Sequence, residues 1–261
     1  MKIKRYCCSF SLVLIFCITG FCQFENRVFR KIVHPKLKDF YATGVYKPEG
    51  KGIWFFSNNS GLAYFDGNDI VNFRYSANDS LSLSSDNIKA LAQDSSGNLW
   101  IGTKAAGLNI INRLTGKIEK LPFKGLASSQ RQENTIRAMF MDDNNNLFIG
   151  LFSKGFLIVN TATRQMKQYN IDTSFQLKGS PNLNTANSFA QDKKNKNLYW
   201  ITTHNGLYVF DKLTEKTSFV FRPDENKISK IQQLPYSVGD CLIDDDNNVW
   251  FLHNNTRALC I

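Results

Sequence analysis

An internal repeat is the feature of this chain that most limits the folds it can adopt. The stretch SGNLWIGTKAAGLNII (96–111) returns in four further, altered copies, each centred on an aromatic residue. The aromatics recur at intervals of 46, 48, 52 and 50 residues and are Trp54, Trp100, Phe148, Trp200 and Trp250. A glycine follows the first four of them by six or seven residues, at Gly61, Gly107, Gly155 and Gly206. Arg257 stands where a fifth glycine is expected. Two markers that keep the same period indicate a structural repeat.

One repeat unit is predicted to form four short β-strands. In the second unit, apolar runs such as LWIGT and LNIIN are separated by the turn-forming stretches SSGN, KAAG and RLTG. Such runs between Gly, Asn and Ser residues are typical of strands. Repeated four-stranded units of about 40–50 residues are typical of a β-propeller, whose sheets bury both faces against their neighbours. We therefore predict an all-β β-propeller with four-stranded antiparallel blades in an incomplete ring of about 4–5 blades.

The two markers have predicted structural roles in the repeat. The recurring aromatics are expected to pack between adjacent blades. Because Phe148 replaces Trp at one of these positions, the sequence suggests that packing needs a large flat group and no indole donor. The recurring glycines are expected to supply a positive φ or a close backbone approach at a turn.

The first 22 residues are predicted to form a signal peptide. A basic start, MKIKRY, precedes the apolar run CCSFSLVLIFCITGF, and cleavage is expected after Cys22. The apolar run is nearly long enough to stay as a membrane anchor. TGFC also resembles a lipoprotein processing box, although Phe21 fits that box poorly. The prediction is a periplasmic protein with a partial propeller over residues 23–261, truncated in its last blade.

Charge and cysteine content restrict the remaining classes of function. The formal net charge is +10, but the basic residues are scattered and no aromatic-interleaved basic stripe occurs, so nucleic acid is not an expected partner. Four of the six cysteines lie in the leader. Cys241 aligns with apolar strand positions and is expected to be a small buried residue, while a disulfide between Cys241 and Cys260 is compatible with an oxidising compartment.

No catalytic, metal-binding or cofactor-binding set is predicted. DDNNN (142–146) and DDDNN (244–248) resemble calcium loops but align with the hairpin turn DSSGN (94–98), so turns are the favoured interpretation. The three histidines are His34, His204 and His253. The last two are expected at the ends of equivalent strands, and no acidic partner recurs beside them to complete a metal site. Ligand contacts are expected on the long loops between units, without named residues.

The repeat resembles a known family. The stretch SLSLSSDNIKALAQDSSGNLWIGTKAAGLNIINRLTGKIEKL (80–121) is similar to the two-component regulator propeller repeat, and the resemblance in register extends over roughly residues 28–261. It implies the periplasmic sensor region of a hybrid two-component histidine kinase, whose later domains are not in this sequence.

The resemblance also implies a function and partners. It implies a non-enzymatic part of a sensor whose ligand is an oligosaccharide or another small extracellular molecule. Contact with a membrane would require the uncleaved leader or a missing C-terminal region. A homodimer through the open ends of the propeller is a further expectation. The alternatives are an exported propeller enzyme, a lyase or glycosidase, and a free-standing carbohydrate-binding propeller.

Overall fold

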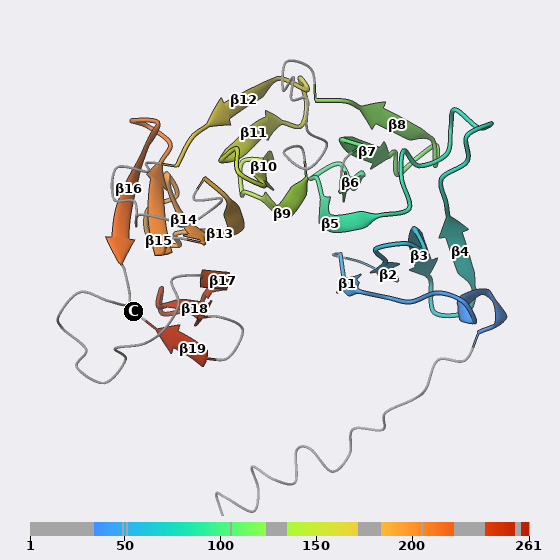
Figure 1. Cartoon of the computed structure of the whole chain (residues 1–261), viewed down its shortest axis with the longest axis horizontal. Helices are drawn as coiled ribbons and strands as arrows, with labels where there is room; N and C mark the ends of the chain where they lie inside the picture. Colours follow the sequence, from blue (N-terminus) through green and yellow to red (C-terminus); the bar gives the residue numbers. More distant parts are fainter. Residues whose placement is uncertain are drawn as a thin grey trace, which may run out of the picture. The chain divides into compact units, whose positions relative to one another are not determined.

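The computed structural model describes most of the chain after residue 33 (Figure 1). The described residues are 34–48, 50, 52–104, 106–123, 135–171, 184–204, 206–221, 238–253 and 257–260. The chain divides into two compact units, Met1–Lys38 and Asp39–Ile261. In the first, a short 3₁₀-helix, η1 (Pro35–Leu37), is described, and the predicted signal peptide lies outside the described residues.

The second unit contains five antiparallel sheets, here called blades 1 to 5, and each follows the order of the sequence. Blade 1 contains β1 (Gly44–Tyr46), β2 (Ile53–Phe56), β3 (Leu62–Phe65) and β4 (Ile70–Phe73). Blade 2 contains β5 (Ile88–Gln93), β6 (Leu99–Thr103), β7 (Leu108–Ile111) and β8 (Ile118–Leu121). Blade 3 contains β9 (Ile136–Met141), β10 (Asn146–Leu151), β11 (Phe156–Asn160) and β12 (Met166–Tyr169). Blade 4 contains β13 (Ala186–Gln191), β14 (Leu198–Thr203), β15 (Gly206–Asp211) and β16 (Lys216–Phe221).

Blade 5 differs from the others in its number of described strands. It contains β17 (Val238–Ile243), β18 (Val249–His253) and β19 (Arg257–Cys260). The predicted all-β architecture of four-stranded antiparallel blades is therefore confirmed for blades 1 to 4, and three strands of blade 5 are described. Among the described residues, no helix has the length and hydropathy of a membrane span.

The blades pack face to face in the order of the chain. In Figure 1 the first strands of the blades lie on the inner side of the second unit and the fourth strands on its outer side. The first strands β5, β9, β13 and β17 contact one another in sequence. Four apolar clusters each join residues of two successive blades, so the core is divided into four layers between sheets. This is how a propeller buries sheets that are apolar on both faces.

The repeated aromatics occupy equivalent places, because each lies on the second strand of its blade. They pair with matching residues of the first strand, and the pairs are Trp54–Tyr46, Trp100–Ala92, Phe148–Phe140, Trp200–Ala190 and Trp250–Leu242. Trp100 and Phe148 are fully buried against the next blade. Trp54 and Trp200 are partly buried in the same way. Trp250 is 40% exposed, because no described residue covers that face of blade 5.

The expectation that the indole donor is unimportant is wrong. Trp100 Nε1 donates to Asp94 Oδ2 at 2.9 Å, and Trp250 Nε1 donates to Asp244 Oδ2 at 2.8 Å. Trp200 Nε1 donates in the same way to an aspartate that follows the first strand of its blade, Asp192, at 3.2 Å. A buried carboxylate needs such donors because an unsatisfied charged oxygen is costly away from water.

Blade 3, which has Phe148, replaces the missing donor with one from the next blade. Tyr199 stacks on Phe148 with ring centroids 4.3 Å apart. Its hydroxyl donates to Asp142 Oδ2 at 2.8 Å, and Lys212 Nζ lies 3.1 Å from the same oxygen. Asp142 therefore accepts a hydrogen bond from a phenol on the next blade, whereas the other turn aspartates accept one from the indole of their own blade.

The recurring glycines have left-handed backbone conformations. Their φ angles lie between 66° and 117°, a region that favours glycine, and the residues are Gly61, Gly107, Gly155 and Gly206. A Cβ on Gly107 would lie 2.9 Å from the carbonyl oxygen of Leu121, and one on Gly155 would collide with that of Tyr169. These turns therefore need both the positive φ and the close approach of the fourth strand.

Candidate ligand-binding cavity

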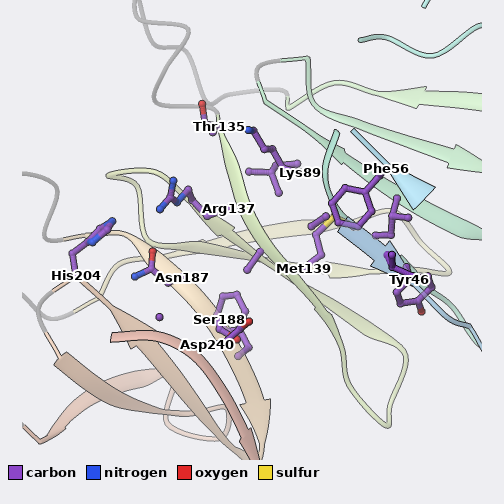
Figure 2. A pocket seen from close by; sticks show the side chains of 17 residues that line it. Tyr46, Phe56, Lys89, Thr135, Arg137, Met139, Asn187, Ser188, His204 and Asp240 are labelled. Atoms are coloured by element: carbon purple, nitrogen blue, oxygen red, sulfur yellow. The ribbon is translucent and has the colours of Figure 1, made fainter. Parts of the chain in front are cut away.

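A cavity of about 550 Å³ lies among the first strands of the blades (Figure 2). Its lining comes from β1, β5, β9, β13 and β17, together with Phe56 of β2 and His204, which directly follows β14. Pockets that bind small molecules commonly have volumes of about 300–1,000 Å³ and mix an apolar lining with a few polar groups. This cavity has both kinds of lining, since Phe56 and Met139 lie in it beside Lys89 and Arg137.

Irregular pairing between the first and second strands positions most of the polar groups. Ile88 and Ala90 pair with successive residues of β6, so Lys89 is an extra, unpaired residue. Arg137 in β9 and Asn187 in β13 have the same place in their own strands. Such β-bulges re-aim a side chain and are frequent beside functional sites. In blades 2, 3 and 4 the bulge residue therefore lines the cavity.

The corresponding irregularity in β17 completes the series. The pairing with β18 shifts between Val238 and Cys241, across Gly239 and Asp240, and both of these line the cavity. Asn187 Nδ2 donates to the carbonyl oxygen of Val238 at 2.9 Å, which ties β17 to β13. The bulges thus present two cations, one amide and one carboxylate from four successive blades.

The positive charges of the cavity lie close enough to affect one another. Burial lowers the pKa of Lys89, and the charges of Lys104 and Arg137 lower this pKa further. Burial also lowers the pKa of His204, with a second contribution from the charge of Arg137. Lys89 Nζ donates to Asn58 Oδ1 at 2.8 Å, which holds the ammonium group in place. In Figure 2, Lys89 and Arg137 lie on the same side of the cavity, apart from Asp240.

The cavity also contains an acceptor without a donor. Asn187 Oδ1 is buried and has no hydrogen-bond partner among the described residues. Buried amide oxygens are normally satisfied, and an exception in a native structure calls for an explanation such as a ligand or water. The arrangement can therefore hold a polar solute of the size of a small sugar.

The sequence did not identify these residues as ligand contacts. It placed ligand contacts on the long loops between units, and the loop segments 124–134 and 172–183 lie outside the described residues. Lys89, Arg137, Asn187 and Asp240 received no role, and His204 was considered only for metal binding. The available signal was the recurrence of a polar residue after a buried aliphatic one, in Ile88–Lys89 and Ile136–Arg137.

The other candidates from the sequence lie elsewhere. Asp142 and Asp244 close tight turns, because each accepts backbone N–H groups, for example from Asn146 at 2.7 Å and Asn248 at 2.8 Å. The side chain of His34 caps η1 by accepting the N–H of Lys36. His253 ends β18, as predicted, and His204 directly follows the equivalent strand. Within the described ranges, no group of three or more His, Cys, Asp or Glu residues could hold a metal ion.

The two cysteines outside the leader are free thiols and form no disulfide with each other. Cys241 lies on β17 in the apolar cluster between blades 4 and 5, and burial raises the pKa of its thiol to about 12. Cys260 is exposed on β19. The small residue at position 241 is therefore partly buried, less than the sequence predicted, and burial disfavours its thiolate.

The second repeat contains the segment that matches a protein-family model. Residues 82–105 match the family model described as "Two component regulator propeller". This segment is a two-component regulator propeller repeat. It contains the end of the loop before blade 2 and the strands β5 and β6, which carry both Lys89 and Trp100. The propeller repeat thus includes one bulge residue of the cavity. No curated protein sequence matches the chain.

Solved structures share the fold at low sequence identity. The extracellular domain of a protein regarded as a one component system from B. thetaiotaomicron superposes with a TM-score of 0.60 and 19% identity, over 79% of this chain and 25% of that chain. PorZ, a surface component of the type-IX secretion system of Porphyromonas gingivalis, gives a TM-score of 0.62 and 15% identity, over 84% of this chain and 32% of that one.

An enzyme also has a related propeller fold. Virginiamycin B lyase from Staphylococcus aureus superposes with a TM-score of 0.58 and 9% identity, over 83% of this chain and 68% of the lyase. The chain spans about a quarter of the one component system domain and about a third of PorZ. At these identities the likeness shows the β-propeller fold alone.

Proposed function

We propose that this chain is the ligand-binding propeller of an exported sensor of the two-component type, and that its cavity among the first strands binds the signal molecule. The observation that carries the proposal is the recurrence of bulge residues around this cavity. Blades 2, 3 and 4 each contribute the polar side chain of one residue that has no partner in the strand ladder, Lys89, Arg137 and Asn187. A purely structural repeat needs no such series of extra residues.

The propeller repeat and the fold support the sensor assignment. Residues 82–105 match the repeat of two component regulators. In this proposal the chain does not catalyse a reaction, and it acts by changing the state of a histidine kinase to which the propeller is linked. The ligand class is a small oligosaccharide, because the cavity volume and its hydrogen-bonding groups suit one or two sugar rings.

Calorimetric titration with a panel of neutral and acidic oligosaccharides tests this function. We expect saturable binding by at least one member of the panel. Val45 lines the cavity and is 61% exposed, so Val45→Trp would fill the cavity without disturbing the core. This variant should weaken binding by about tenfold or more, which corresponds to about 1.4 kcal/mol.

The matched control is Val71→Trp on β4, where the side chain is 50% exposed and does not line the cavity. Its affinity should equal that of the unaltered chain. Binding that is insensitive to Val45→Trp would place the ligand elsewhere. A panel without any binding member would contradict the proposed function.

Export is part of the same proposal and has its own test. Cleavage after Cys22 leaves Gln23 as the first residue of the mature protein. N-terminal sequencing of the protein from the periplasmic fraction should therefore begin at Gln23. A chain that retains Met1 in that fraction would contradict cleavage and favour a membrane anchor.

A further inference from the structure

Two cations on adjacent blades face the same cavity without a carboxylate between them. Lys89 and Arg137 are the bulge residues of β5 and β9, and these strands contact each other. Neither side chain forms a salt bridge with a described residue, although five other basic side chains of the described ranges do. Figure 2 shows that both side chains point to the same side of the cavity.

The surroundings of these cations favour a bound anion. The charged groups that affect the pKa of Lys89 are Lys104 and Arg137, and both lower it, so like charges repel there. Lys89 is partly buried and anchored to Asn58, which limits its freedom to move into water. An anion between Lys89 and Arg137 would remove this repulsion.

We propose that the cavity binds its ligand through an oxyanion group, a carboxylate, sulfate or phosphate, held by Lys89 and Arg137. This inference rests on the proposed function. The planar guanidinium of Arg137 suits two parallel hydrogen bonds to an oxyanion, and the ammonium of Lys89 acts as a point charge. Asp240 accepts hydroxyl groups, so the ligand combines one anionic group with neutral donors.

The test uses sugars that differ in one substituent, titrated into the whole chain by calorimetry. The probes are D-glucuronate, D-glucose 6-sulfate, D-glucose 6-phosphate and neutral D-glucose. At least one oxyanion probe should bind at millimolar concentration or below, and D-glucose should bind at least about tenfold more weakly, since hydrogen bonds to charged groups contribute about 1.5–3 kcal/mol. The three oxyanion arms distinguish the chemical source of the anion.

Variants connect this preference to the two residues. Arg137→Gln and Lys89→Gln keep similar side-chain lengths without the charge, and each should weaken oxyanion binding about tenfold or more. Arg137 is exposed, so its loss should leave the melting temperature unchanged. Arg137→Lys should restore part of the affinity. Lys120→Gln, an exposed cation on β8 outside the cavity, should have no effect.

The inference and the proposed function fail in different ways. Neutral oligosaccharides that bind in the cavity with affinities unaffected by Arg137→Gln would overturn the oxyanion inference and leave the sensor function standing. Failure of every oxyanion probe to bind at millimolar concentration would also overturn it. Oxyanion binding that Lys120→Gln reduces as much as Arg137→Gln would show general charge attraction and would equally overturn it.

Discussion

Aspartates at the first turn of blades 2, 4 and 5 connect the turn to the repeated aromatic. Asp94 accepts the backbone N–H and the amide of Asn98 at 2.8 and 3.0 Å, as well as the indole N–H of Trp100. Because Asp94 is 6% exposed and Trp100 is fully buried, water cannot replace the indole readily. The aromatic therefore fixes the turn as well as filling the space between blades.

Substitution of Trp100 separates these two contributions. Trp100→Phe removes the hydrogen bond and part of the volume, and should lower the free energy of unfolding by about 1–3 kcal/mol. Trp100→Ala also leaves a cavity, and should cost about 3–5 kcal/mol. Urea denaturation measures both. Equal losses for the two variants would show that the indole hydrogen bond, rather than packing, dominates.

Tyr199 offers the complementary experiment in blade 3. Tyr199→Phe keeps the ring that stacks on Phe148 and removes the hydroxyl that donates to Asp142. Since a buried carboxylate oxygen then loses a donor, we expect a loss of about 1–3 kcal/mol in the free energy of unfolding. Tyr208→Phe measures the effect of removing another buried hydroxyl on the same blade. A harmless Tyr199→Phe would mean that the remaining donors to Asp142 Oδ2, Lys212 Nζ and Asn146 Nδ2, are sufficient.

At the residue scale, the sequence predicted where the repeated aromatics lie but not the hydrogen bonds that they form. The spacing of the aromatics correctly indicated equivalent strand positions, since period reports on geometry. The role of the indole was misjudged because Phe148 was read in isolation. Its compensation comes from Tyr199, 51 residues later in the chain, and such a contact is visible only once blades 3 and 4 are packed. An aspartate six residues before Trp100 and Trp250 was the available signal.

At the level of elements, the turn between the second and third strands needs glycine for its positive φ and for the close approach of the fourth strand. Comparison with a glycine in the turn between β7 and β8 separates these two reasons. Gly155 and Gly116 have the same φ of 66°, but a Cβ would collide with Tyr169 only at Gly155, and would meet no atom within 4 Å at Gly116. Gly116→Ala should therefore cost about 1–2 kcal/mol for the left-handed conformation alone. Gly155→Ala should cost at least about 2 kcal/mol more, because the backbone of β12 must move.

Thermal and urea denaturation of these two glycine variants would provide the comparison. The two changes share the substituted residue and the backbone angle, so their difference reports the close approach of the strands. Equal losses of stability would contradict the claim that strand β12 restricts the turn. A larger loss for Gly116→Ala would contradict it more strongly.

The turn of blade 5 should respond to acid at an unusually low pH. The hydrogen bond from Trp250 is the largest cause that lowers the pKa of Asp244, from 3.8 to about 2. A carboxyl whose pKa is lower in the folded state stabilises the fold above its unfolded pKa, and this contribution is lost as pH falls from about 4 through about 2. The indole N–H resonance of Trp250 should therefore shift with a midpoint near pH 2.

Asp244→Asn should abolish that titration while leaving the other indole signals unchanged. A midpoint close to pH 4 would show that the carboxylate is not held by Trp250 in solution. The comparison with Trp54, which has no aspartate after the first strand of its blade, provides an internal reference in the same spectrum.

Strand boundaries followed from the sequence more closely than strand irregularities did. Runs such as LWIGT became β6 because aliphatic and aromatic residues between turn formers favour strands. The bulges at Lys89 and Arg137 could not be placed in this way. An extra residue shifts the pairing by one position, and that shift depends on how the second strand aligns beside it. For this reason the candidate cavity was absent from the sequence-based prediction.

In the whole molecule, the face of blade 5 that no described blade covers is expected to promote self-association. Leu242, Trp250 and Leu252 are 59%, 40% and 38% exposed, and they surround an apolar pocket of about 520 Å³. Exposed apolar patches mark interaction surfaces or aggregation sites. We expect the chain to form dimers or larger species whose fraction rises with concentration, as measured by light scattering.

Leu242→Lys should reduce this association, because a charge on the sheet face opposes apolar contact. Leu114→Lys is the control, since Leu114 is 91% exposed in the turn between β7 and β8 and lies outside the patch. A monomer at every concentration tested would contradict the expectation. Equal effects of the two lysines would attribute association to net charge instead of the blade 5 face.

The repeat was sufficient to predict the propeller, because each repeat forms a sheet with two apolar faces that neighbouring sheets must cover. It could not identify which faces stay uncovered among the described residues. That property depends on contacts between blades: Trp100 packs against blade 3, whereas no described blade follows Trp250. The same reasoning explains why anchors alike in sequence range from buried to substantially exposed.

The bulges have an evolutionary consequence. Lys89 and Arg137 have no partner in the strand ladder and belong to none of the apolar clusters, so substitution there disturbs neither pairing nor core. The neighbouring Ile88 and Ile136 are fully buried and bear the structural constraint. Under the proposed function, selection can therefore alter ligand preference at one residue per blade while the scaffold stays constant. On that proposal, a single fold can diversify into receptors for many different signals without losing stability.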